Sequence, residues 1–266
     1  MDYTIFYFII VGFVAQLINC ALGMAFGVLC TSLLLFAGLT PLAASASVHT
    51  AELFGTAASG FCHLRLGNVD KKLLRALLLP GIIGGALGAC LLIHIPAQII
   101  KPFISVFLLI MGVKIVWNIL KTNGESQSTP KPPRTLGFVA GFLDAVGGGG
   151  WGSIATSQLV ATGHSPRLVI GTVNFARFFI TIVSSTVFFI TLRTINVPVV
   201  LGLAIGAVLA APVAAPFSKM VKPKALAVAV ATLIGGLAVA GLYSTRIGPM
   251  LSNHVQLAGL QQQPWK

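Results

Sequence analysis

The sequence has few charged residues: Asp, Glu, Lys and Arg make up 8% of its 266 residues, against about 25% in soluble domains. Hydrophobic residues make up 56%, and the mean hydropathy is +0.95. So little charge leaves scant room for a separate soluble domain. The composition instead predicts an all-α polytopic membrane protein.

The charge that is present is mostly positive, with a formal net charge of +12. Most of the basic residues lie in short loops between apolar segments, which is the pattern of the positive-inside rule. The charge therefore indicates a lipid bilayer as the partner and argues against nucleic-acid binding.

Several chemical motifs are absent from the sequence. The four cysteines form no C-x-x-C pair and lie in apolar segments, which argues against a disulfide framework or a zinc site. The sequence has no H-E-x-x-H or G-x-S-x-G motif, which argues against an intramembrane enzyme. It has no G-x-x-x-x-G-K-[ST] motif either, which argues against transport driven directly by ATP. No cofactor or metal is expected. The N-terminus lacks the basic region of a signal peptide, so we expect the first segment to be retained.

Long apolar runs fill most of the chain, and most have the roughly 20 residues of a spanning helix. They occupy residues 5–36, 43–64, 73–95, 99–120, 137–162, 168–192, 197–217 and 225–245. The pattern predicts a first transmembrane repeat at 1–120, a polar linker at 121–135, a second repeat at 136–245 and a polar tail at 246–266.

The two halves resemble each other. At an offset of 125 residues, the stretch 12–59 is identical to 137–184 at 16 of 48 positions. The identities include glycines and a proline, for example Gly38 with Gly163 and Pro41 with Pro166. Apolar composition alone would not align these residue types, so the chain is predicted to contain two homologous repeats.

The orientation of the repeats depends on the first segment of each half. If 5–36 and 137–162 are re-entrant hairpins, each half has three further spans and the repeats are inverted. If every run crosses once, the repeats are parallel. Setting aside Lys114 and Arg177, the basic residues divide 11 inside to 4 outside for hairpins and 10 to 5 for single crossings. The positive-inside rule barely separates the two topologies, because their counts differ by one charge. The length of 5–36 and the glycines favour hairpins and inverted repeats.

Glycines interrupt both first segments. Asp144–Gly152 contains four consecutive glycines, and Asn19–Gly27 is its weaker counterpart. Each glycine costs about 0.8–1 kcal/mol in a helix, and paired breaks indicate the substrate site of a transporter. The free N–H groups at such a break would bind an anion. Gly84 and Gly88 are expected instead to permit close helix packing.

Several motifs together resemble the TauE/SafE family of sulfite and organosulfonate exporters over nearly the whole chain. They are Ala46–Glu52, Ser59-Gly60, His63, Gly67–Val69, Gly81-x-x-Gly84-x-x-x-Gly88, Gly147–Gly152 and Gly163–Asn174. The resemblance implies a small multi-pass permease of the prokaryotic inner (plasma) membrane, built from two homologous halves. It also implies transport of sulfite, a sulfonate or another sulfur-containing or carboxylate anion.

Four polar residues at repeat-equivalent positions are candidates for the site. Asn19 and Asp144 precede the breaks and are expected to cap the second half-helices, although Asp144 could also carry a proton. Glu52 and Arg177 are also equivalent, and they could form an ion pair. Alternatively, Arg177 binds the anion through its guanidinium group and Glu52 accepts and releases a proton.

Further candidates surround these four. His49 lies one turn from Glu52 and pairs by repeat with Asn174; it is interpreted as a proton relay, a substrate contact or a core histidine. Ser47 could donate to an anion or bond to its own helix, and Trp151 either lines the pathway or packs. The predicted substrate-binding residues are Asn19, Gly23, Gly27, Ser47, His49, Asp144, Gly147, Gly148, Gly149, Gly150, Trp151, Asn174 and Arg177. The candidates for proton coupling are Glu52, Asp144 and His49.

The sequence therefore predicts a secondary transporter that moves a small anion by alternating access around two broken helices. Coupling of this transport to protons is part of the hypothesis. The alternative is a passive anion channel, which would share the same features. The sequence leaves open the identity of the anion, the direction of transport, the coupling ion and the oligomeric state. A homo-oligomer is one of the alternatives.

Overall fold

The structure is a computed structural model that describes residues 3–22, 24–121, 134–192, 196–220, 228, 232–237 and 239. Its described elements are all helices. They are α1 (Tyr3–Leu22), α2 (Phe26–Phe36), α3 (Pro41–Arg65), α4 (Lys71–His94), α5 (Ala97–Lys121), α6 (Arg134–Gly147), α7 (Trp151–Ala161), α8 (Pro166–Leu192) and α9 (Val197–Met220). Most of the linker, most of the run 225–245, the tail and Gly23 lie outside the described residues.

Three of the described helices are long and apolar enough to cross a membrane: Lys71–His94, Ala97–Ile115 and Pro166–Leu192. Shorter apolar helices occupy Ile5–Cys20, Phe26–Phe36 and Val197–Ala210. The 25-residue α3 is long enough but less apolar, because its buried face carries polar side chains such as His49 and Glu52. An all-helical chain of this kind is consistent with a membrane protein.

Short turns end the two 11-residue helices in the same way. Gly38 follows α2 and Gly163 follows α7, with φ angles of 93° and 90° that a residue with a side chain rarely adopts. Each turn is closed by a bond from the next N–H to the carbonyl five residues earlier, Leu39 to Leu34 and His164 to Leu159. A proline then starts α3 and α8, so both halves use the same local rule.

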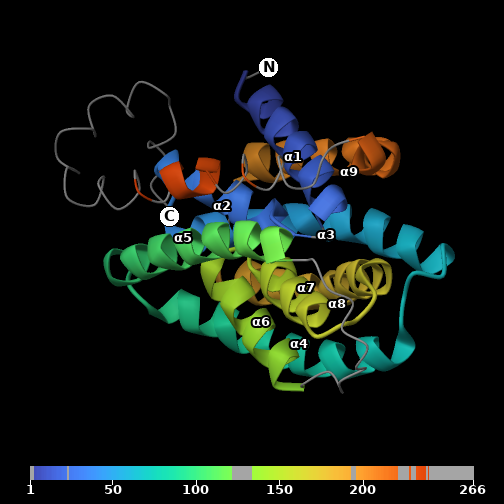
Figure 1. The fold of residues 1–266 in the computed structure, drawn as a ribbon. Helices are drawn as coiled ribbons and strands as arrows, with labels where there is room; N and C mark the ends of the chain where they lie inside the picture. Colours follow the sequence, from blue (N-terminus) through green and yellow to red (C-terminus); the bar gives the residue numbers. More distant parts are fainter. Residues whose placement is uncertain are drawn as a thin grey trace.

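The helices pack in a series. α1 lies along α9, α9 contacts α3, α3 contacts α8, α8 contacts α4, and α4 lies along α6. Figure 1 shows α1 and α9 on one side of the molecule and α4 and α6 on the other. The repeat offset of 125 would relate α1 to α6, α3 to α8 and α4 to α9. Under that relation, each contact in the first half of the series has an equivalent contact in the second half.

Glycines set the close spacing at both outer pairs. A Cβ atom on Gly12 of α1 would lie 2.4 Å from the carbonyl oxygen of Leu203, and one on Gly137 of α6 would lie 2.6 Å from that of Leu77. Gly84 would meet the carbonyl of Phe138 at 2.2 Å in the same way, and Gly88 that of Phe142 at 2.4 Å. The prediction that Gly84 and Gly88 serve helix packing is therefore confirmed.

Candidate functional site

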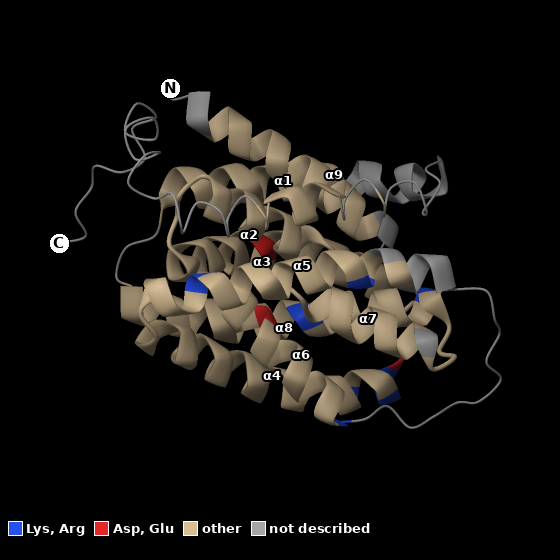
Figure 2. Ribbon diagram, turned by 60° about the vertical axis from the view of Figure 1, so that its left-hand side comes forward, with Lys and Arg blue, Asp and Glu red and all other residues tan. Residues whose placement is uncertain are grey.

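A buried cluster of charged side chains lies where α3, α6 and α8 meet. Arg177 Nη2 is 2.8 Å from Glu52 Oε2 and 3.1 Å from Asp144 Oδ1. All three side chains are at most 2% exposed. Figure 2 shows acidic and basic segments in the middle of the bundle, where most of the ribbon is tan. The ion pair between Glu52 and Arg177 that the repeat alignment suggested is therefore present, and Asp144 joins it.

His49 extends the cluster through Asp144. Its Nε2 atom lies 3.3 Å from Asp144 Oδ2, and its Nδ1 atom lies 2.9 Å from the carbonyl oxygen of Ser45. A carbonyl can only accept, and the Ser45 hydroxyl donates to the carbonyl of Ala145 at 2.7 Å, so Nδ1 must carry a hydrogen. A neutral ring would then have an unprotonated Nε2 facing a carboxylate. The contact therefore requires one proton between His49 Nε2 and Asp144 Oδ2.

Asp144 also connects the two sides of the break between α6 and α7. Its Oδ1 atom accepts a 2.7 Å hydrogen bond from the backbone N–H of Trp151, the first residue of α7. Asp144 therefore caps α7 from the preceding helix, as the sequence predicted. With Arg177 and His49 as its other partners, this carboxylate holds α6, α7, α8 and α3 together.

The break in the first half differs. Ala25 precedes α2 with a left-handed φ of 94°, and no side chain caps this helix. Asn19, the counterpart of Asp144, is 1% exposed, and neither its amide nitrogen nor its oxygen has a hydrogen-bond partner among the described residues. The expected cap by Asn19 is thus absent. An amide on α1 does not reach the free N–H groups as the Asp144 carboxylate does.

The two breaks touch each other through glycine backbones. A Cβ atom on Gly149 would lie 2.3 Å from both Gly27 C and Val28 N, and one on Gly27 would lie 2.9 Å from Arg177 Nη2. Gly148 has a φ of 68°, and its carbonyl accepts from the hydroxyl of Thr31 at 2.5 Å. The first turn of α2 is therefore next to the guanidinium group and the second break.

The glycine run has a packing role as well. A Cβ atom on Gly147 would lie 2.3 Å from the ring of Phe107 on α5, and one on Gly150 would lie 2.8 Å from it. Gly150 also has a φ of 151°. Since the whole glycine run is in contact with protein atoms, its surroundings meet the requirement that broken backbone be enclosed within a membrane.

Comparison with known proteins agrees with the sequence motifs. The family described as "Sulfite exporter TauE/SafE" matches residues 8–241. The chain belongs to this family. It is also 42% identical over 255 residues to a Bacillus subtilis (strain 168) protein named "Probable membrane transporter protein YtnM", a match that covers 92% of this chain and 84% of that protein. No solved structure was found to match it. The TauE/SafE chain is therefore a membrane transporter and not an enzyme.

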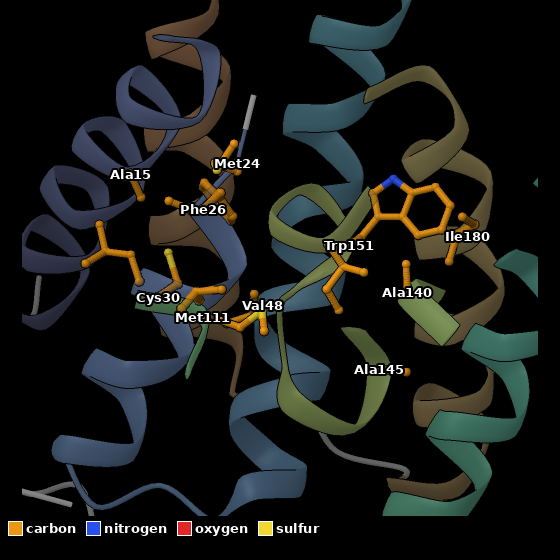
Figure 3. Packing of buried hydrophobic residues seen from close by; sticks show 14 of the residues in the cluster. Ala15, Met24, Phe26, Cys30, Val48, Met111, Ala140, Ala145, Trp151 and Ile180 are labelled. Carbon is orange, nitrogen blue, oxygen red and sulfur yellow. The ribbon is translucent and has the colours of Figure 1, made fainter. Parts of the chain in front are cut away.

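Trp151 in this TauE/SafE chain packs instead of pointing to an open space. It is 0% exposed, and its indole Nε1 donates to the carbonyl of Val173 on α8 at 3.0 Å. Figure 3 shows the ring close to Ile180, with Ala140 nearby. The packing alternative for this residue therefore holds in the structure, and the tryptophan fixes α7 against α8.

Other predicted residues lie outside the charged cluster. The amide nitrogen of Asn174 donates to the carbonyl of Ile170 on its own helix at 3.0 Å, so Asn174 does not mirror the contacts of His49. Ser47 is 2% exposed on α3, and the ion pairs of the described residues in this cluster do not include it. The cluster unites Glu52, His49, Asp144 and Arg177, with Gly27 and Gly149 beside them.

Sequence reasoning missed two residues that support this arrangement. Ser45 contacts both His49 and Ala145, and Thr31 joins α2 to the second break. Ser45 stands four residues before His49, a spacing that places both on one helical face. Thr31 matches Thr156 in the repeat but carries no local sign of its partner, which lies 117 residues away.

Proposed function

We propose that the chain is a secondary transporter that moves a small anion through the site formed by Arg177, Glu52, Asp144 and His49. The observation that carries this proposal is a buried guanidinium group between two acidic side chains, next to the first turn of α2. Ionisable residues inside a membrane protein are costly and typically mark a substrate or proton path.

The guanidinium group suits an oxyanion. Its planar arrangement of N–H donors matches the oxygens of sulfite, a sulfonate or a carboxylate. The uncapped first turn of α2 adds free N–H groups and the positive end of a helix dipole. The family description also supports sulfite or a related sulfur anion as the substrate.

The charge balance of the cluster supports proton coupling. Arg177 contributes +1, Glu52 and Asp144 contribute −1 each, and the proton between His49 and Asp144 contributes +1, so the cluster is neutral. A monovalent anion would leave an uncompensated buried charge, which is strongly unfavourable. Protonation of Glu52 would restore neutrality and release Arg177. One proton would thus accompany each monovalent anion.

Alternating access would move one group of helices against the other. One group contains α1, α9 and α3, the other contains α6, α4 and α8, and α3 meets α8 between them. The matched contacts support two repeats that rock about this interface. With 11 residues each, α2 and α7 span about 16 Å, half of a hydrocarbon core of about 30 Å, which supports inverted repeats with re-entrant first segments.

The location follows from this proposal. A carrier that couples an anion to protons works across a membrane that maintains a proton gradient. We therefore place the chain in the prokaryotic inner (plasma) membrane as a multi-pass protein.

Counterflow in proteoliposomes tests the proposal. Purified protein is reconstituted with labelled sulfite, a sulfonate or a dicarboxylate, and exchange against unlabelled anion is measured. Saturable exchange of at least one anion is expected, and Arg177→Gln should abolish it. Arg167→Gln is the matched control, because Arg167 is on the same helix but bonds to Asn68 at 2.6 Å, away from the cluster. Full exchange in Arg177→Gln would refute the proposed role of this residue.

A further inference from the structure

The face of α8 that continues from Arg177 carries buried hydrogen-bond donors without acceptors. Arg177 Nε, Thr181 Oγ1, Ser184 Oγ and Ser185 Oγ have no hydrogen-bond partner among the described residues. Arg177, Thr181 and Ser184 are at most 2% exposed, and Ser185 is 8% exposed. The spacings of four, seven and eight residues place all four on one face of the helix. We call this set the α8 donor row.

Unpaired buried donors are unusual, because leaving one without an acceptor costs about 1–3 kcal/mol. A buried Ser or Thr in a helix commonly bonds to the carbonyl four residues earlier. Several hydroxyls of this chain do so: Ser32, Thr50, Ser105 and Thr186 bond to the carbonyls of Val28, Ala46, Lys101 and Ile182 at 2.7–3.0 Å. The hydroxyls of the α8 donor row do not.

The equivalent row on α3 differs at its threonine. Thr56 and Ser59 match Thr181 and Ser184 at the repeat offset, with identical residue types. The Thr56 hydroxyl donates to the carbonyl of Glu52 at 2.7 Å, and Ser59 lies near the thiol of Cys20 on α1. The same residue type, threonine, thus has a partner on α3 and, among the described residues, none on α8. Residue type alone does not account for the unpaired donors of α8.

Glycines of α4 pack closely against the α8 donor row. A Cβ atom on Gly85 of α4 would lie 2.8 Å from Ser184 Oγ. Gly81 of α4 and Gly141 of α6 also approach each other there, with 2.3 Å from a Gly141 Cβ to the Gly81 carbonyl oxygen. Ser184 therefore faces a glycine, which presents no side chain that could serve as an acceptor.

We propose that the α8 donor row binds the transported anion, with Arg177 Nε and Thr181 Oγ1 contacting its head group and Ser184 and Ser185 forming the next contact along its route. A ligand rich in acceptors supplies what all four donors lack, and an oxyanion has that chemistry. Arg177 can serve it while Nη2 stays near Glu52 and Asp144, because Nε carries an N–H donor of its own. The row then leads toward the membrane face at which α8 ends. This inference rests on the proposed function, since it assigns further contacts to the same anion.

Two substitutions that preserve size test the α8 donor row. Thr181→Val and Ser184→Ala remove an unpaired hydroxyl, while Thr56→Val and Ser59→Ala are the matched controls at the equivalent positions of α3. In counterflow with labelled sulfite and with a labelled sulfonate, Thr181→Val is expected to raise the KM about tenfold, the loss of one hydrogen bond to a charged group. Ser184→Ala should raise it several-fold, and the controls should change it less than twofold.

Thermal unfolding of the same variants separates a binding role from a structural one. Because their hydroxyls have no partner, Thr181→Val and Ser184→Ala should unfold at the wild-type temperature or above it. Added sulfite should raise the unfolding temperature of the wild-type protein and do so less in Thr181→Val. If the KM is unchanged in both variants while the wild type still exchanges the anion, the proposed binding role of the α8 donor row alone would be overturned. No saturable exchange by folded wild-type protein would instead overturn the proposed function, and this inference with it.

Discussion

At the scale of single residues, Glu52 is the group expected to release its ion-pair partner, Arg177, and to take up a proton. Neither of its carboxylate oxygens has an aligned hydrogen bond among the described residues, so its contact with Arg177 is an ion pair without further support. Asp144, in contrast, accepts from three donors. This difference predicts that Glu52 gives up Arg177 during the cycle and that Asp144 keeps its partners.

The substitution Glu52→Gln is expected to uncouple anion binding from protons. In the wild type, protonation of Glu52 frees Arg177, so the KM for the anion should fall as the pH is lowered. Without an ionisable group at this position, the KM should be low and nearly independent of pH. A pH series of counterflow measurements checks this, with Glu52→Asp as the control that retains a carboxylate. A Glu52→Gln variant with the pH dependence of the wild type would contradict the role of Glu52.

The substitution Asp144→Asn should destabilise the protein. An amide cannot accept from the Trp151 N–H, Arg177 and His49 together, and it leaves Arg177 and a protonated His49 with less compensation. Loss of one partner of a buried ion pair typically costs about 3–5 kcal/mol. Thermal unfolding in detergent measures the effect. Asp70→Asn is the control, because Asn at this helix cap can replace the bonds to Lys72 and Leu73; equal changes in both variants would contradict the account.

The site residues could be predicted only in part, and the reason lies in distance along the chain. The repeat offset predicts the pair of Glu52 and Arg177, because it makes their positions equivalent. The addition of Asp144 to that pair depends on how the break between α6 and α7 meets α8, which no local pattern encodes. Asn19 shows the converse case. Its position matches that of Asp144, but equivalence in sequence did not give it equivalent contacts.

At the scale of helices, the contact between the two breaks requires glycine. Gly149 lies against the backbone of Gly27 and Val28, where no flexible side chain could move aside. The run of four glycines predicted an interruption of the helix near residues 147–150, and α6 ends at Gly147 while α7 begins at Trp151. That one break would rest on the other could not be predicted, because the contact joins segments more than 100 residues apart.

Substituting Gly149 with Ala should therefore disturb the fold. The added methyl group would meet backbone atoms at 2.3 Å, and overpacking of this kind costs about 1–3 kcal/mol or more. The yield of folded protein and its unfolding temperature measure the effect. Gly236→Ala is the matched control, since a Cβ atom there has no other atom within 4 Å and should leave both quantities unchanged. Wild-type stability of Gly149→Ala would show that the breaks do not pack as described.

At the scale of the whole molecule, the series of helices from α1 to α6 suggests that each half packs its first helix against a helix of the other half. The sequence predicted two related halves but not this exchange of partners, because similarity between repeats does not reveal which copy contacts which. The orientation of the repeats in the membrane stays a prediction, and so do the domain boundaries at 1–120, 121–135, 136–245 and 246–266.

Two glycine substitutions test whether the halves are built alike. Gly12→Ala and Gly137→Ala each place a methyl group against a backbone carbonyl, at 2.4 Å and 2.6 Å. Both are expected to lower stability by a similar amount, about 1–3 kcal/mol. Unfolding temperatures provide the comparison, with Gly235→Ala as the control because its nearest neighbour would lie at an ordinary 3.7 Å. A large loss for one variant and none for the other would show that the outer helix pairs are not equivalent.

The central claim is that protons and a small anion move together through the cluster around Arg177. The most direct test is uptake of labelled anion into proteoliposomes across an imposed proton gradient, beginning with equal anion concentrations on both sides. The account predicts accumulation above the equal starting concentration, which collapses when a protonophore is added and is absent in Arg177→Gln. Saturable flux that never exceeds the starting concentration under any proton gradient would contradict coupling and favour the passive anion channel.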